Sequence, residues 1–199
     1  MTKPYHHGEL REALIQAALH VLECDGPAAL SLRGLARTVG VSSMAPYHHF
    51  ADRSALLAAV ATEGFVRLQA SKQLIQASQT DVRLALASGG ANYVRFILDH
   101  PNLYRLMRSP DFADRALYPD LHRAAAGPAR TLIELMTRLI GERGLQSPSP
   151  NQGAQLLWGL SHGIGTLALD GQLPPDGAPD LAYEGSLAMV DGWIARHSG

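Results

Sequence analysis

Apolar residues recur at helical spacing along most of the chain, and no stretch alternates in the way that an exposed hairpin strand does. Residues 9–25 carry one such pattern, which Gly26 and Pro27 close. A second pattern places an apolar stripe on a short helix, and its members are Leu32, Leu35, Ala36 and Val39. Ser31 can cap this short helix and Gly40 can end it. The chain is therefore predicted to be all-α.

Longer helices follow. The spacing predicts them at about residues 53–78, 81–100, 120–143, 151–169 and 180–196, with a short helix opening at Pro101 and an irregular link after it. Asp52 can cap the first of these helices, whose inward stripe is Leu56, Leu57, Val60, Gly64 and Leu68. At about 1.5 Å per residue this helix is long enough to connect two domains. We therefore expect a boundary between residues 1–53 and residues 54–199.

After the short helix, the sequence predicts a tight turn and a second short helix. Gly40 provides a permissive backbone for the turn, and Ser42 or Ser43 can cap a helix that runs to about Phe50. Pro46 lacks an N–H group, which costs nothing within the first helical turn, so its position favours Ser43 as the cap. Two short helices that cross at a tight turn form a helix-turn-helix.

The outward side of that second helix is suited to contact DNA. It offers small, apolar and hydrogen-bonding side chains of the kind that meet base edges and phosphates in a major groove, namely Ser43, Met44, Ala45, His48 and His49. Phe50 and part of the Tyr47 ring are expected to turn inward, with the Tyr47 hydroxyl aimed at a phosphate. Arg33 and Arg37 lie on another face of the preceding helix.

Composition limits the alternatives. The chain has 199 residues and a net charge of −1, so it has no general basic character, but residues 31–53 hold three arginines against Asp52 alone. Cys24 is the sole cysteine, which excludes an internal disulfide and favours a reducing, cytoplasmic setting. No apolar run approaches the roughly 20 residues of a membrane span, and the start lacks the apolar core of a signal peptide. No membrane partner is expected.

The histidines are not predicted to hold a metal. Adjacent residues such as His6 and His7, or His48 and His49, point to different sides of a helix, and no carboxylate or cysteine completes a ligand set. Residues 1–8 are instead expected to form a flexible arm. No cofactor is expected.

The stretch VSSMAPYHHF followed by ADRSALLAAV resembles the DNA-binding domain of the TetR/AcrR family of one-component transcriptional repressors. The resemblance rests on a valine-serine turn, a tyrosine ahead of an aromatic-rich end and a basic residue opening the long helix: Val41, Ser42, Tyr47, His49, Phe50 and Arg53. The sequence departs from the family pattern at Met44, where glycine is frequent, and at Pro46, where leucine is frequent. The resemblance implies an N-terminal three-helix bundle with the helix-turn-helix and a C-terminal helical domain for effector binding and dimerisation. The predicted DNA-binding set is Arg33, Ser42, Ser43, Met44, Ala45, Tyr47, His48, His49 and Arg53.

The second half is similar to one C-terminal domain class of that family, which carries a Trp-His-Gly pattern. Trp158, His162 and Gly163 match it within LLWGLSHGIGTLALDGQL, and HPNLYRLM at residues 100–107 is similar to another segment of the class. Glycines four residues apart let another helix approach closely, so the last two helices are expected to pair across a two-fold axis. The predicted dimer interface consists of Trp158, Gly159, His162, Gly163, Met189 and Trp193.

An effector cavity is expected between the middle helices, because the family usually has one. Its candidate lining consists of aromatic, sulfur-containing and polar side chains at helical spacing: Asn92, Tyr93, Phe96, His100, Tyr104, Met107 and Met136. Residues of these types at this spacing are also typical of a plain hydrophobic core. The expected effector is an unidentified small molecule.

The expected function is that of a ligand-responsive DNA-binding regulator, a repressor that binds a pseudo-palindromic operator as a homodimer. Residues 159–163 also fit G-x-S-x-G, the nucleophile motif of serine hydrolases, in which Ser161 would be the nucleophile. That chemistry needs a strained strand-to-helix turn, whereas this pentapeptide falls in a helical run, so no enzyme activity is expected. An architectural protein that binds DNA without sequence preference is the remaining alternative.

Overall fold

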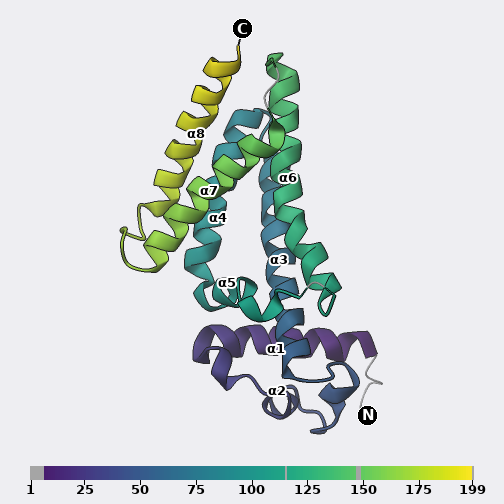
Figure 1. Ribbon diagram of the computed structural model, residues 1–199. Coiled ribbons are helices and arrows are strands. Elements are labelled where there is room, and N and C mark those ends of the chain that lie inside the picture. The colour runs from purple at the N-terminus through teal and green to yellow at the C-terminus, as the bar shows by residue number, and fades with distance from the viewer. Residues whose placement is uncertain (1–6, 115, 147–148, 199) are drawn as a thin grey trace. The chain divides into compact units, whose positions relative to one another are not determined.

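The structure is a computed structural model that describes residues 7–114, 116–146 and 149–198, with side chains from Glu9 onward (Figure 1). Most of the arm predicted at residues 1–8 lies outside the described residues. At its end, a helix already begins at His7. The helices are α1 (His7–Asp25), α2 (Leu32–Val39), α3 (Arg53–Ser78), α4 (Val82–Asp99), α5 (Pro101–Met107), α6 (Pro119–Arg143), α7 (Pro150–Leu169) and α8 (Ala178–His197). Short 3-10 turns join some of them: η1 (Pro27–Ala29), η2 (Ala45–His48) and η3 (Pro110–Phe112). No strand occurs in the described residues, and the all-α prediction is confirmed. None of the described helices combines the length and the apolar character that crossing a bilayer requires.

The ends of α2 and α3 follow the capping residues that the sequence predicts. The Gly34 N–H donates to Ser31 Oγ at 3.1 Å, and Gly40 ends α2 in the left-handed region with a φ of 79°. The Ala55 N–H donates to the Asp52 carboxylate at 2.8 Å at the start of α3. These bonds satisfy N–H groups that the first turn of a helix leaves unpaired, and they confirm both predicted helix starts.

The first compact unit comprises residues 7–65 together with residues 100–124. In this unit α5 is fastened to α1, because the Leu103 N–H donates to the Glu23 carboxylate at 3.0 Å. The unit therefore extends beyond the boundary predicted at residue 53 and includes a segment that is distant in the sequence. Periodicity along the chain does not reveal which distant segments pack together.

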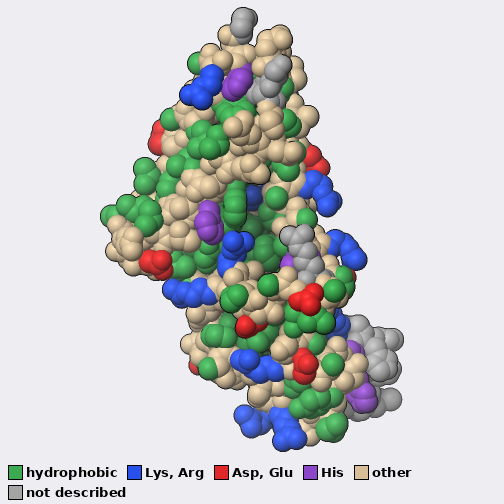
Figure 2. All heavy atoms as spheres, viewed as in Figure 1, with side chains coloured by type: hydrophobic (Ala, Val, Ile, Leu, Met, Phe, Trp, Pro, Cys, Tyr) green, Lys and Arg blue, Asp and Glu red, His purple; other side chains and the backbone are tan. Residues whose placement is uncertain are grey.

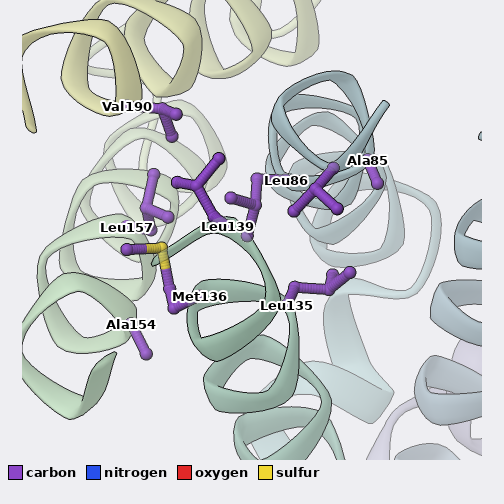
Figure 3. Packing of buried hydrophobic residues seen from close by; sticks show 9 residues of the cluster. Ala85, Leu86, Leu135, Met136, Leu139, Ala154, Leu157 and Val190 are labelled. Carbon is purple, nitrogen blue, oxygen red and sulfur yellow. The ribbon is translucent and has the colours of Figure 1, made fainter. Parts of the chain in front are cut away.

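The second compact unit comprises residues 66–99 and the described part of 125–198. In this unit α4 lies against both α7 and α8 (Figure 1). Gly153 lets α7 approach α6 closely, since a Cβ at that position would lie 2.3 Å from Met136 Cε. Apolar side chains from α4, α6, α7 and α8 meet in one core (Figure 3): Val82, Ala85, Leu86, Leu135, Met136, Leu139, Ala154, Leu157 and Val190.

Candidate functional site

The segment after α2 differs from the predicted second helix. Instead of an α-helix capped by Ser43 and running to Phe50, the structure has the 3-10 turn η2, which follows Met44 without any side-chain cap. Pro46 lies in the first turn of this segment, where a missing N–H costs an α-helix nothing, so the missing N–H does not account for the difference. Most of the backbone bonds span three residues, such as the one from the His49 N–H to the Pro46 carbonyl at 3.0 Å.

Phe50 anchors this turn to the first unit. Its side chain is 2% exposed, and the Arg11 guanidinium carbon lies 5.5 Å from the centroid of its ring. Its backbone N–H donates to the Pro46 carbonyl at 2.9 Å and so closes the turn. Pro46 is buried as well. The inward orientation predicted for Phe50 is confirmed, and it fixes which side of η2 faces outward.

The turn η2 and the residues on either side of it hold most of the predicted DNA-binding set. Tyr47 is 40% exposed, so its ring is turned inward only in part, as predicted. The remaining members fall into two groups: Ser42, Ser43, Met44 and His48 are exposed, whereas Ala45 and His49 are half-buried. The turn therefore presents hydroxyl, imidazole, thioether and phenol groups together, which is a set able to meet base edges and phosphates.

Basic residues flank this turn. Arg33 and Arg37 are exposed on α2, and Figure 2 shows Lys and Arg side chains gathered at the α2 end of this unit. Arg53, a member of the predicted DNA-binding set, also makes bonds within its own unit: its Nε donates to the Leu30 carbonyl at 3.0 Å, and another guanidinium nitrogen donates to the Pro27 carbonyl. Arg53 therefore also holds η1 against the start of α3.

The second unit contains a cavity that is open to solvent and has about 500 Å³ of empty volume. Its walls come from α3, α4, α6, α7 and α8, and they are mainly apolar: Ile75, Leu86, Leu132, Leu135 and Leu157. Its polar lining includes Lys72, Tyr93, Thr131, Ser161 and Ser186. A mainly apolar cavity with a few polar groups is the kind of site that small molecules occupy.

The residues predicted to line an effector cavity are mostly elsewhere, and Tyr93 is the one that lines this cavity. Asn92 donates to Ser71 Oγ at 2.8 Å, and Phe96 is buried on α4. Met136 is part of the apolar core. The others, His100, Tyr104 and Met107, belong to the first unit. The sequence missed Lys72 and Ser186, because they lie on helices whose meeting cannot be seen from spacing.

His162 on α7 contacts Tyr93 on α4, and Trp158, which is 43% exposed, lies beside His162. The Tyr93 hydroxyl and His162 Nδ1 are 3.2 Å apart, and the rings of Trp158 and His162 lie 5.2 Å apart between centroids. Trp158 also lines the cavity. The interface predicted across the two-fold axis thus includes side chains that contact their own chain. Met189 and Trp193 likewise pack against the apolar core of their own unit.

A different set of α7 residues forms a stripe on the open side of the helix, away from Trp158 and His162. At about 100° per residue its members fall within about 80° of one another: Leu156, Gly159, Gly163 and Leu167. Leu156 and Leu167 are exposed, and a Cβ at Gly159 or Gly163 would meet no described atom beyond its own helical turns within 4 Å. A matching stripe on α8 was not predicted, and its exposed members are Leu181, Ala188, Gly192 and Ala195.

Ser161 does not have the surroundings of a hydrolase nucleophile. It lies within α7 and is buried, and its Oγ donates to the Leu157 carbonyl one turn earlier at 3.0 Å. The nucleophile motif instead requires a serine lifted on a sharp strand-to-helix turn. The close helix packing is at Ser161 alone, because a Cβ on Gly90 of α4 would come within 2.9 Å of its Oγ, whereas a Cβ at Gly159 or Gly163 would meet nothing described beyond its own helical turns within 4 Å.

Family models match both parts of the chain. The model described as "Bacterial regulatory proteins, tetR family" matches residues 14–60, and the model described as "Tetracyclin repressor-like, C-terminal domain" matches residues 86–190. Nucleoid occlusion factor SlmA of Marinobacter nauticus is 34% identical over 76 residues. That stretch spans 38% of this chain and 39% of the length of that relative.

Solved structures share the fold over nearly the whole chain. A protein of unknown function from Rhodococcus sp. RHA1 has a TM-score of 0.84 and 34% identity, covering 96% of this chain and 98% of that chain. Mycobacterium smegmatis AmtR has a TM-score of 0.61 and 21% identity, over 94% and 87% of the two chains. The TetR family transcriptional regulator PfmR from Thermus thermophilus has a TM-score of 0.65 and 16% identity, over 88% and 96%. At the identities of AmtR and PfmR, the likeness shows the fold alone.

Proposed function

The chain belongs to the tetR family of bacterial regulatory proteins and is a DNA-binding transcription regulator, and from that premise we propose that it represses transcription as a homodimer bound to a pseudo-palindromic operator. A small molecule in the cavity of the second unit releases it from the DNA. The proposal locates the protein in the cytoplasm, where its DNA lies. The observation that carries it is the exposed set of hydrogen-bonding side chains on η2, next to the arginines of α2.

The η2 turn is proposed to read bases, and its neighbours to hold the phosphates. Ser43, Met44 and His48 are exposed at one turn and have the donor, acceptor and apolar groups that distinguish base edges. Arg33 and the Tyr47 hydroxyl are proposed to contact phosphates, which fixes the register of the turn in the groove. The remaining predicted members are proposed to support these DNA contacts: Ser42, Ala45, His49 and Arg53. For Arg53, the proposal uses the guanidinium N–H groups that do not donate to backbone carbonyls.

The dimer is proposed to form through the open stripes of α7 and α8. Support comes from the small and apolar character of both stripes and from the empty space over Gly159, Gly163 and Gly192. Both helices pack against α4 on other sides, so the stripes are free to meet a second copy. A two-fold axis uses the same patch from both copies and makes a four-helix interface.

Effector binding is proposed to act through the distance between the two reading turns. Successive major grooves on one side of DNA are about 34 to 36 Å apart, so both turns of a dimer bind well only near that separation. Residues of α4, α7 and α8 line the cavity, and α7 and α8 also carry the proposed dimer interface. A ligand that binds one spacing of the dimer better than the other shifts the population toward it and changes DNA affinity.

Substitutions on α2 and on η2 should separate phosphate contact from base reading. We expect Arg33→Met to weaken binding to every DNA sequence alike and to lower the salt slope by about 1, because one phosphate contact is lost. We expect His48→Ala to cost about 1–3 kcal/mol on the preferred sequence and to relax the choice of base at one position of each half-site. Titrations on an operator and its single-base variants, at several salt concentrations, measure both effects.

The same titrations show how the assignment would fail. Arg123 is exposed in the first unit, on α6 and away from η2 in the sequence, so Arg123→Met serves as the matched loss of one positive charge. If Arg123→Met lowers the salt slope as much as Arg33→Met does, general charge explains the binding. If His48→Ala leaves the base preference unchanged at every position, η2 does not read bases through His48.

A further inference from the structure

The cavity of the second unit contains an ammonium group that has no anionic partner among the described residues. Lys72 lines the cavity from α3, and no Asp or Glu of the described chain contributes to the lining. None of the ion pairs formed by described residues involves the Lys72 amine, which instead lies 5.7 Å from the centroid of the Tyr93 ring. Lys72 is half-buried, and a charge that is partly withdrawn from water is stabilised by an opposite charge. The arrangement therefore favours an anionic guest.

Ser186 supplies a second unsatisfied polar group in the same cavity. Its side chain is 0% exposed, and its Oγ has no hydrogen-bond partner among the described atoms. Ser161 also lines the cavity but differs, because its Oγ already donates to the Leu157 carbonyl at 3.0 Å. A buried hydroxyl without a partner costs free energy that a ligand oxygen would recover. The Ser186 hydroxyl can thus donate to a ligand oxygen once the side chains that enclose it shift.

Gly90 brings both serines to the wall of the cavity. A Cβ at Gly90 would lie 2.6 Å from Ser186 Oγ and 2.9 Å from Ser161 Oγ, so only glycine leaves room for the two hydroxyls. The rest of the wall is apolar and includes Ile75, Leu86, Leu132 and Leu135. This combination matches a ligand that has one charged end and a hydrophobic body.

We propose that the effector is a small carboxylate with an apolar body, whose carboxylate pairs with Lys72 and which accepts a hydrogen bond from Ser186. The inference rests on the effector role proposed above for this cavity. A cationic ligand would be repelled by the ammonium group, and a neutral one would leave that charge unpaired. A carboxylate satisfies Lys72 through a charge-assisted hydrogen bond, and its body covers the apolar wall.

The titration of Lys72 agrees with this assignment. Burial lowers the pKa of the Lys72 amine to about 8. A bound carboxylate favours the charged amine and raises that pKa, so carboxylate affinity should weaken as the pH rises through about 8. The other titratable group of the described lining is Tyr93 on α4, and its hydroxyl is hydrogen-bonded to His162 on α7. Neither of these groups is a carboxylate that would compete with the ligand for Lys72.

The amine can be observed directly, because Lys3 and Lys72 are the lysines of the chain. Reductive methylation with isotope-labelled formaldehyde marks both lysines and the amino terminus, and a Lys3→Arg variant assigns the Lys72 resonance. Octanoate and benzoate are the probes, with octanol and benzyl alcohol as neutral partners of matched size. We expect the carboxylates to shift the Lys72 resonance and to raise its pKa, and the alcohols to do neither.

Variants of Lys72 separate charge from shape. In calorimetric titrations, Lys72→Met should weaken binding of the best carboxylate by about 10- to 100-fold, because a charge-assisted hydrogen bond contributes about that factor to affinity. The same substitution should leave alcohol binding unchanged. Lys72→Arg keeps the charge and should retain most of the affinity. The proposal is overturned if no carboxylate binds up to about 10 mM, or if Lys72→Met affects acid and alcohol equally.

The two serines form a matched pair. Ser186→Ala removes the hydroxyl that has no partner among the described atoms, so it should weaken carboxylate binding without lowering the free energy of unfolding. Ser161→Ala removes a hydroxyl whose proton is already donated to Leu157, so it should change carboxylate binding less than Ser186→Ala does. The reverse order of effects would contradict the role given to Ser186.

DNA binding measured on the same samples distinguishes failure of this inference from failure of the proposed function. If carboxylates bind at Lys72 but leave operator affinity unchanged, the cavity takes this ligand class and its effector role fails. If the protein binds an operator and the carboxylates do not bind, the regulator stands and the ligand class is wrong. Release of the operator by a carboxylate, lost in Lys72→Met, supports both.

Discussion

The Gly163→Glu variant should be a folded monomer that binds operator DNA about 10² to 10⁴ times more weakly than the dimer, because the second half-site is no longer bound intramolecularly. Gly163 lies on the open stripe of α7, where a Cβ would meet no described atom beyond its own helical turns within 4 Å. The fold of the single chain therefore has room for the side chain. In a two-fold interface each copy would place a buried, unpaired carboxylate against the other.

The stability of the monomer strengthens this test. Replacing a glycine inside a helix raises helix propensity by about 0.5–1 kcal/mol, so the unfolding of the single chain should not become easier. Gly141→Glu is the matched control, because Gly141 lies in α6, is exposed and has the same empty space around its Cα. Sedimentation velocity gives the oligomeric state of both variants. A Gly163→Glu protein that remains dimeric at micromolar concentration would exclude this stripe as the interface.

Phe50→Ala should destabilise the first unit by about 3–5 kcal/mol, the usual cost of removing a buried aromatic ring from a core. Phe50 is 2% exposed, and its backbone closes η2, so loss of the ring frees the turn that carries the proposed reading residues. Operator binding should fall with it. Denaturant unfolding and a DNA titration of the same preparation measure the two effects together.

Tyr47→Ala is the matched aromatic truncation three residues earlier. Because the Tyr47 side chain is 40% exposed, we expect a loss of stability clearly smaller than that of Phe50→Ala, together with a distinct loss of DNA affinity. Equal destabilisation by the two substitutions would mean that both rings serve the core. A Phe50→Ala protein with unchanged unfolding would contradict the anchoring role of Phe50.

The ends of α2 are predictable from the sequence because they depend on local chemistry. A serine hydroxyl that reaches the N–H three residues on, and a glycine able to adopt positive φ, are properties of Ser31 and Gly40 themselves. The same local reasoning fails at Pro46. Its position suits the first turn of an α-helix, yet the segment forms mainly 3-10 bonds and is a single tight turn, which no local property of Pro46 requires.

The lining of the cavity is not predictable from spacing, because it depends on which helices meet. Tyr93, Tyr104 and Met107 follow one another on α4 and α5 with helical periodicity, yet Tyr104 and Met107 fold with the first unit. Lys72 and Ser186 lie far apart in the sequence and line one cavity. Nothing in the pattern around either residue distinguishes it from an ordinary helical position.

The exposed stripe on α7 that we propose as the interface, in contrast, follows from helical phase alone. The sequence predicts that Trp158 and His162 fill the seam beside Gly159 and Gly163. At about 100° per residue, however, they project to another side of the helix. Tracing the helical phase from Gly163 leads instead to Leu156 and Leu167, which the structure leaves exposed.

Sequence-specific DNA binding is the central claim, and an equilibrium titration at fixed salt tests it most directly. The full-length protein is titrated with DNA from the region flanking its own gene and with a scrambled duplex of the same composition, and a selection of bound genomic fragments extends the search to other operators. We predict a pseudo-palindromic fragment that binds more than about 10³ times more tightly than the scrambled duplex. Equal, salt-sensitive binding to every fragment would contradict the account.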